Sequence, residues 1–268
     1  MNRSSLIEEP INPSAFARPI ELYVFIDPLC TDCWSLQPLL RKLQVEYDRY
    51  FTLRIVLRTS LPSMNLQCTR DTESTDTCDK AHAAFPSIAV KAAEFQGKRA
   101  GFRFLSKMLE YSFLKSKNVS SFSILLEIAE TLNLDIDEFT SDFSSKNVLR
   151  SLQVDLYLSK EMEVEQAPTF VFFNGNIEDE GLKVEGLYDY SVYKQILEEL
   201  VGKSLTPEPP PNLESLFQRF DTLETKEIAT FYGLSEKSAE RELKKRLLQQ
   251  NVERMAFQDV TLWRKKRG

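Results

Sequence analysis

The sequence has one histidine, four cysteines and no long apolar stretch, and each scarcity excludes a class of function. No apolar run approaches the ~20 residues of a membrane-spanning helix. Residues 1–19 lack the apolar core of a secretory signal, so we expect a cytoplasmic protein without membrane partners. Because His82 is the only histidine, acid–base or metal schemes that need two histidines fail.

A strong positive charge is also missing: the formal net charge is −6. This argues against a general nucleic-acid binder. The charge is uneven, because residues 213–268 hold 12 Lys or Arg and 9 Asp or Glu. That segment is net +3 and the remainder is net −9, which indicates a separate C-terminal module. Its predicted third helix mixes basic side chains with acidic ones that phosphates would repel, so we expect protein contacts and no nucleic-acid partner.

The first structured part reads as a βαβ unit. Glu21–Ile26 is a short aromatic and β-branched run, typical of a buried strand. Apolar residues at helical spacing predict a helix over Trp34–Tyr47, and Leu53–Leu57 reads as a second strand. Such a unit favours a parallel strand pair with a right-handed crossover.

A helical region separates this unit from a second set of strands. Helices are predicted over 86–97, 100–115, 121–132, 136–144 and 146–162. Thr169–Phe173 and Lys183–Leu187 then read as a strand pair around the Asn174-Gly175 turn signal, and a helix follows Asp189. The order βαβ, helical insert, ββα predicts the α/β class and a DsbA-like thioredoxin fold with an inserted helical domain.

These patterns predict four parts. Residues 1–19 form a flexible N-terminal arm, and 20–202 form the DsbA-like thioredoxin domain, with its helical insertion at about 81–163. Residues 203–212 are a Pro-rich linker, which we interpret as a semi-rigid, extended spacer. Residues 213–268 predict three helices, over Leu213–Leu223, over Thr225–Tyr232 and from Ser235 to about Gln250, followed by a β-ribbon. This order indicates a small winged-helix-like domain.

Two cysteines stand at the predicted strand-to-helix junction, in Cys30-Thr31-Asp32-Cys33. Free N–H groups at a helix N-terminus favour a thiolate, so Cys30 is the candidate attacking thiol and Cys33 the resolving one. Pro168, directly before a predicted strand, is the candidate cis-proline facing them. Asp32 adds a negative charge that disfavours the thiolate. Two interpretations stay open: a vestigial or regulatory pair, and a pair that turns over substrate.

The remaining cysteines lie in a polar loop. Cys68 and Cys78 are candidate redox-sensitive thiols. Cys78 and His82 have a plausible zinc-ligand spacing, but a structural site takes four ligands with paired short spacings. We therefore expect no metal and no cofactor.

Four segments resemble one family closely, the SpxH (YjbH) family of DsbA-like proteins from low-GC Gram-positive bacteria. The segments are Asp27-Pro-Leu-Cys-Thr-Asp-Cys-Trp34, Lys91-Ala-Ala-Glu-Phe-Gln-Gly97, Glu165-Gln-Ala-Pro-Thr-Phe-Val-Phe-Phe173 and Glu180-Gly-Leu-Lys-Val-Glu-Gly-Leu-Tyr188. The resemblance covers most of the chain, and its cysteine pair falls on Cys30 and Cys33. Some members carry a His- and Cys-rich N-terminal arm, which residues 1–20 do not have.

The resemblance implies a non-enzymatic adaptor in the stress response. Members of the family bind the transcription regulator Spx and promote its degradation by the ClpXP protease, so the implied partners are Spx and ClpXP, the latter directly or through Spx. The alternative is a cytosolic thiol-disulfide oxidoreductase of the DsbA type. A DNA-binding regulator is a third and weaker hypothesis, because the chain is acidic.

Overall fold

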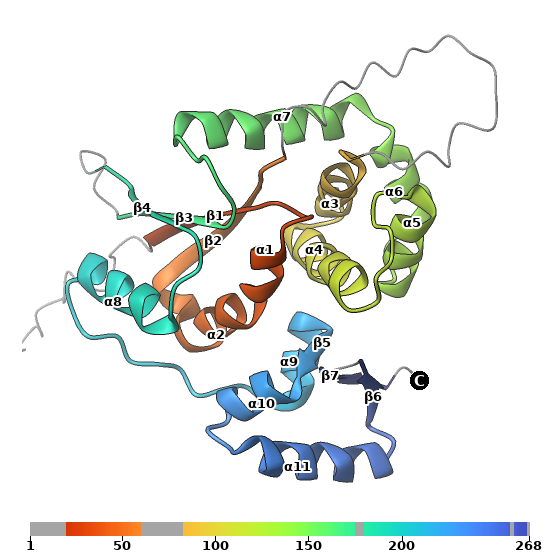
Figure 1. Cartoon of the computed structure of the whole chain (residues 1–268), viewed down its shortest axis with the longest axis vertical. Coiled ribbons are helices and arrows are strands. Elements are labelled where there is room, and N and C mark those ends of the chain that lie inside the picture. The colour runs from red at the N-terminus through yellow and green to blue at the C-terminus, as the bar shows by residue number, and fades with distance from the viewer. Residues whose placement is uncertain (1–19, 60–82, 175–179, 258–259, 267–268) are drawn as a thin grey trace, which may run out of the picture.

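The computed structural model describes residues 20–59, 83–174, 180–257 and 260–266 (Figure 1). The predicted N-terminal arm lies outside these residues, and so do Cys68, Cys78 and His82. Within the described ranges no helix is both long enough and apolar enough to cross a membrane.

A four-stranded mixed sheet forms the centre of the molecule. Its strands are β1 (Ile20–Ile26), β2 (Phe51–Leu57), β3 (Thr169–Phe173) and β4 (Leu182–Glu185), in the order β2-β1-β3-β4. β1 pairs in parallel with β2, whereas β3 runs antiparallel to both β1 and β4. The predicted parallel pair and the predicted antiparallel pair are therefore both confirmed.

Helices cover both faces of this sheet, because the side chains of β1 alternate between them. Leu22 and Val24 lie in the large core with residues of α2 (Gln37–Tyr47) and α8 (Tyr190–Val201). Phe25 lies in a smaller core on the other face, beside the end of α7 (Lys146–Glu161). Figure 1 shows α2 and α8 on one side of the sheet and α7 on the other.

The helical insert closely follows the predicted boundaries. Its helices before α7 are α3 (Phe85–Phe95), α4 (Lys98–Phe113), α5 (Phe122–Thr131) and α6 (Ile136–Phe143). Gly97 joins α3 to α4 at a φ of +125°, a conformation that favours glycine. The Asp135 carboxylate accepts from the Glu138 N–H and caps α6. Thus the DsbA-like arrangement of a thioredoxin sheet with a helical insert is confirmed.

Two predicted helices are wrong in detail. The predicted helix Trp34–Tyr47 is divided into α1 (Thr31–Ser35) and α2, with Pro38 in the first turn of α2, where its missing N–H costs nothing. The short 3₁₀ helix η2 (Asp48–Tyr50) follows α2. The predicted helix Leu213–Leu223 ends at Phe220, because Asp221 takes a φ of +62° and the chain enters a strand.

The C-terminal module, residues 213–266, has its own sheet and core. Its elements are α9 (Leu213–Phe220), β5 (Thr222–Glu224), α10 (Thr225–Phe231), α11 (Glu236–Leu248), β6 (Val252–Ala256) and β7 (Thr261–Lys265). The three strands are antiparallel, in the order β5-β7-β6. Trp263 is fully buried at the centre. The winged-helix assignment of this module stays a prediction.

The Pro-rich linker is extended and is fastened to the thioredoxin body, which we define as residues 20–202. Leu205 is buried in the large core. The Glu208 N–H donates to the Glu46 carbonyl at 2.8 Å, and Arg49 donates to the Thr206 carbonyl at 2.8 Å. The linker therefore lies along the body and does not act as a free spacer.

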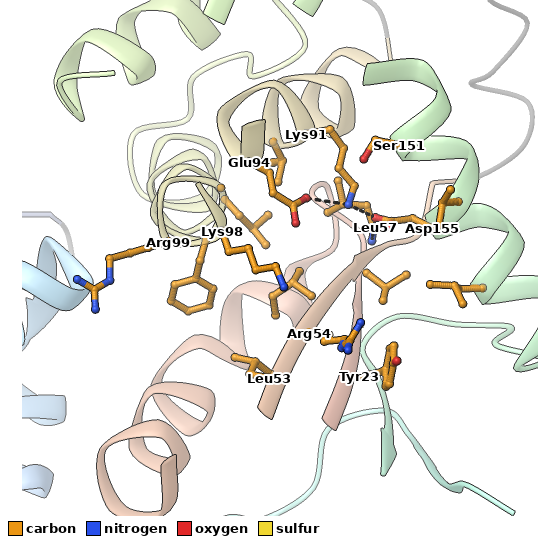
Figure 2. A pocket seen from close by; sticks show the side chains of 18 of the residues that line it. Tyr23, Leu53, Arg54, Leu57, Lys91, Glu94, Lys98, Arg99, Ser151 and Asp155 are labelled. Atoms are coloured by element: carbon orange, nitrogen blue, oxygen red, sulfur yellow. Dashed lines mark hydrogen bonds and ion pairs between the residues drawn. The ribbon is translucent and has the colours of Figure 1, made fainter. Parts of the chain in front are cut away.

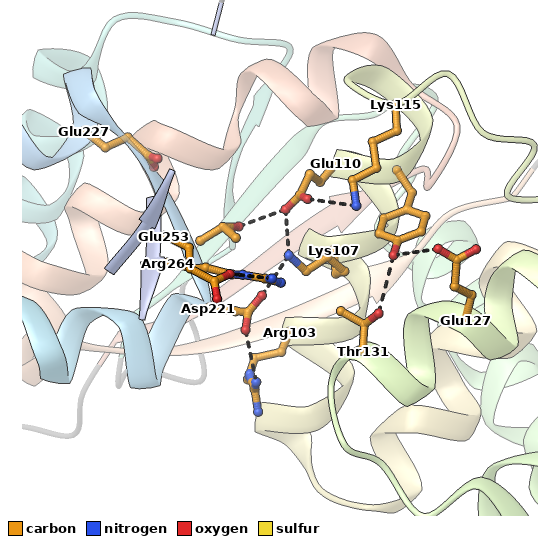
Figure 3. A network of polar contacts seen from close by, with 12 residues as sticks. Arg103, Lys107, Glu110, Lys115, Glu127, Thr131, Asp221, Glu227, Glu253 and Arg264 are labelled. Carbon is orange, nitrogen blue, oxygen red and sulfur yellow. Dashed lines mark hydrogen bonds and ion pairs between the residues drawn. The ribbon is translucent and has the colours of Figure 1, made fainter. Parts of the chain in front are cut away.

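Buried charges join the module to the body. Lys107 on α4 lies 2.8 Å from both Glu110 and Asp221, and Thr222 donates to Glu110 at 2.9 Å (Figure 3). A second buried pair joins Arg41 on α2 to Glu227 on α10. Apolar contacts also cross the interface, since Val45 of α2 belongs to the module's core. Because each buried charge depends on a partner across the interface, the two parts hold one fixed arrangement.

Candidate functional site

The thiol pair lies where β1 ends and α1 begins. Cys30 is the N-cap of α1, in an extended conformation, and its N–H donates to the Asp27 carbonyl at 3.1 Å. The Asp27 carboxylate accepts from the Leu29 N–H at 2.9 Å, which closes a tight turn around Pro28. The turn holds Cys30 half-buried at the surface, whereas Cys33 points into the core and is fully buried.

The predicted cis-proline faces this pair. The peptide bond between Ala167 and Pro168 is cis. The Cys30 Sγ lies 3.4 Å from the Ala167 carbonyl oxygen, to which the thiol donates. The fold thus brings together residues 137 positions apart.

Burial sets the electrostatics of the site. It raises the pKa of the Cys33 thiol far above its ordinary value. It also raises the pKa of Asp27, although the Leu29 N–H and the nearby Arg58 guanidinium oppose that shift. Asp32 is exposed, so solvent screens its charge.

The arrangement has the parts for thiol-disulfide exchange: a partly accessible thiol, a buried second thiol and a neighbouring cis-proline loop. Both cysteines are free thiols. The described residues contain no group of three His, Cys, Asp or Glu side chains that could hold a metal ion. The other candidates, Cys68, Cys78 and His82, lie in the part of the chain that is not described.

A second feature of the surface was not predicted from the sequence. A cavity of about 630 Å³ lies along the outer edge of β2, between that strand, the α3–α4 corner and α7 (Figure 2). Lys91 lies at one end and bridges Glu94 and Asp155, at 2.8 Å from each. The lining residues come from strands, from helices of the insert and from the C-terminal module, so no single motif marks the cavity.

Comparisons with known proteins give consistent results. A family model described as thioredoxin matches residues 23–195. The ClpXP adapter protein SpxH of Bacillus subtilis is 38% identical over 92% of this chain and 89% of its own length. The same-named protein of Halalkalibacterium halodurans is 37% identical with the same coverage. Among solved structures, α-DsbA1 of Wolbachia pipientis aligns with a TM-score of 0.50 and 14% identity, over 69% of this chain and 86% of its own, which supports the fold alone.

Proposed function

The chain belongs to the SpxH family of ClpXP adapter proteins, and we propose that it is itself an adaptor that binds Spx and promotes its degradation by ClpXP. We place it in the cytoplasm, where that protease and regulator would meet it. The proposal includes the predicted division into a thioredoxin domain (20–202), a linker (203–212) and a C-terminal domain (213–268).

The extent of the similarity carries this proposal. The alignment with 37% identity covers 92% of the chain, which is more than the thioredoxin domain alone, so it includes the C-terminal module. The buried ion pairs between the body and this module support the same view, because they would present the two parts to a partner as one rigid surface.

A binding role also fits the thiol site. We propose that Cys30 and Cys33 are a regulatory or vestigial pair, with Pro168 shaping the surface beside them. Cys33 is fully buried, and burial raises the pKa of its thiol, which disfavours a thiolate at that position.

A reconstituted degradation assay tests the proposal. Purified ClpXP and Spx are mixed with the wild-type chain or with the Cys30→Ala/Cys33→Ala variant, and Spx is followed over time. We expect both proteins to accelerate loss of Spx. An unchanged rate with the wild-type chain would refute the adaptor function.

The thiol geometry favours one second candidate, a thiol-disulfide oxidoreductase. Cys30 would attack a substrate disulfide, forming a mixed disulfide and releasing one substrate thiol. Cys33 would then attack the Cys30 sulfur and release the second substrate thiol, which leaves the substrate reduced and the pair oxidised. Dithiothreitol-coupled reduction of insulin measures this activity. Turnover that disappears in Cys30→Ala would support the enzyme, and no turnover above the uncatalysed rate would refute it.

A further inference from the structure

Strand β2 is the outer strand of the described sheet, and its backbone has one open side. The Arg58 N–H donates to Ile26 of β1 at 2.9 Å, whereas the preceding N–H, of Leu57, points away and donates to Asp155 of α7 at 2.8 Å. Backbone N–H groups alternate between the two edges of a strand, so the N–H groups of Leu53 and Ile55 point to the same edge as that of Leu57. Neither has a backbone hydrogen-bond partner on that side among the described residues.

The cavity lies against this open edge. Leu53 to Leu57 form one wall, and Val154 and Leu158 of α7 stand among the residues opposite. Val154 is 56% exposed, although it is a β-branched apolar residue on a helix. We call these residues, together with Lys98 and Arg99, the edge groove. An exposed strand edge beside apolar side chains is a template for a further strand.

The edge groove is positively charged in a protein that is net −6. The charged residues that line the whole cavity are the cations Arg54, Lys91, Lys98, Arg99 and Arg219 and the anions Asp48, Glu94 and Asp155. Each of the three anions already has a cation partner: Lys91 bridges two of them, and Arg219 lies 3.0 Å from Asp48. Two cations, Lys98 and Arg99, have no ion pair with any described residue, and Lys98 points into the cavity (Figure 2).

The position of these two cations is unfavourable for the free protein. Lys98 and Arg99 open α4, whose first turn has no acidic residue. The helix dipole favours anions at this end of α4 and disfavours cations. An acidic ligand beside α4 would remove that cost.

We propose that the edge groove binds an extended, acidic segment of a protein partner, which pairs with β2 through Leu53 and Ile55 and places a carboxylate near Lys98. The inference rests on the proposed function in one respect, that the segment belongs to a protein held by the adaptor. Main-chain hydrogen bonds would supply affinity, and Lys98 and Arg99 would select for acidic side chains.

Labelled peptides test this with the full chain. The probe is a capped heptapeptide, Thr-Glu-Val-Glu-Val-Glu-Thr, and its control replaces each glutamate with lysine. Fluorescence anisotropy measures binding, and NMR measures amide exchange at each residue. We expect the acidic peptide to bind at least tenfold more tightly than the lysine control. Added salt should weaken its binding, and the bound peptide should slow exchange at the Leu53 and Ile55 amides.

Two variants separate charge from backbone pairing. Lys98→Glu is expected to lower the affinity for the acidic peptide about fivefold or more at low salt. Lys237→Glu on α11 is the matched control and should leave that affinity unchanged. Ile55→Pro removes one outward N–H without taking a hydrogen bond from β1, and should abolish binding. A melting temperature within a few degrees of wild type shows that each variant is folded. Because Lys98 is exposed, its variant carries the test alone if Ile55→Pro fails to fold.

Three results would overturn the inference. The first is an equal affinity of the acidic peptide for wild type and Lys98→Glu. The second is protection that maps to residues other than Leu53 and Ile55. The third is full protection of both amides in the free protein, which would mean that another part of the chain or a second copy already occupies the edge. The degradation assay does not enter these outcomes, so the inference can fail while the adaptor function stands.

Discussion

Replacement of Arg41 by methionine should loosen the C-terminal module from the thioredoxin body. Arg41 Nη1 lies 3.1 Å from the Glu227 carboxylate and donates at 3.1 Å to the Thr222 carbonyl, so one side chain of α2 holds two elements of the module. The Arg41 and Glu227 side chains are only 6% and 2% exposed. Methionine keeps the apolar volume of the arginine stem and removes the charge.

The expected cost is about 3 kcal/mol in the free energy of unfolding. Breaking a buried ion pair from one side costs about 3–5 kcal/mol, because the remaining charge is left uncompensated. We choose the lower end because Glu227 keeps a hydrogen bond from the Glu224 N–H, at 2.7 Å. The Arg41→Met/Glu227→Gln double variant buries no lone charge, so it should recover about 2 kcal/mol of that loss.

The two tryptophans provide the assay. Trp34 belongs to the body, where it stacks on Phe113, and Trp263 is fully buried in the module. In a Trp34→Phe background, urea unfolding followed by tryptophan emission therefore reports the module alone. The control is Lys244→Met, which removes the exposed Lys244–Glu240 pair on α11 and should not shift the transition.

Two outcomes would refute this reasoning. One is an Arg41→Met transition that coincides with the Lys244→Met control. The other is a double variant whose loss equals the sum of the two single losses, since independent contributions would mean that the two charges do not depend on each other.

Three further changes follow from the packing. Gly101→Ala should cost about 1–3 kcal/mol by urea unfolding, because a Cβ there would lie 2.9 Å from the Glu94 Cβ and 3.0 Å from its Cα. Trp263→Phe should cost about 1–3 kcal/mol, because it opens a cavity and leaves Thr225 without the indole N–H donor at 2.9 Å. Burial raises the pKa of Asp27, so the folded state binds the proton of this carboxyl more tightly than the unfolded chain does. The free energy of unfolding should therefore fall as the pH rises above about 4, the ordinary pKa of an aspartate. Urea titrations from acidic to neutral pH should show a smaller loss in Asp27→Asn than in wild type, because the raised pKa values of Asp155 and Glu224 contribute equally to both proteins.

Much of the fold follows from local patterns. The spacing of apolar residues predicts all five helices between 86 and 162, because each buries one stripe against the same core. The strand-Cys-x-x-Cys-helix junction and Pro168 indicate the thioredoxin type, and the structure brings Cys30 and the Ala167-Pro168 bond together. These features depend on residues that are close in sequence or on a motif with a constant place in the fold.

Two features that the sequence analysis missed share one physical reason. Strand β5 exists only because Thr222 pairs with Arg264, some forty positions later, and local propensity cannot encode that pairing. The linker is predicted as a semi-rigid, extended spacer, and the sequence does not show that its backbone is held by Glu46 and Arg49 of the body. In both places tertiary contacts decide the conformation.

Taken alone, the sequence determined the thioredoxin type, the helical insert, the thiol pair and the family, since each is written in periodicity or in a contiguous motif. Only the tertiary structure decided that the C-terminal module is docked through buried charges, and that β2 keeps an open edge beside Lys98. Those two features arise where separate elements meet. A charge such as Arg41 looks solvated in the sequence and becomes a buried contact only when α2 and α10 come together.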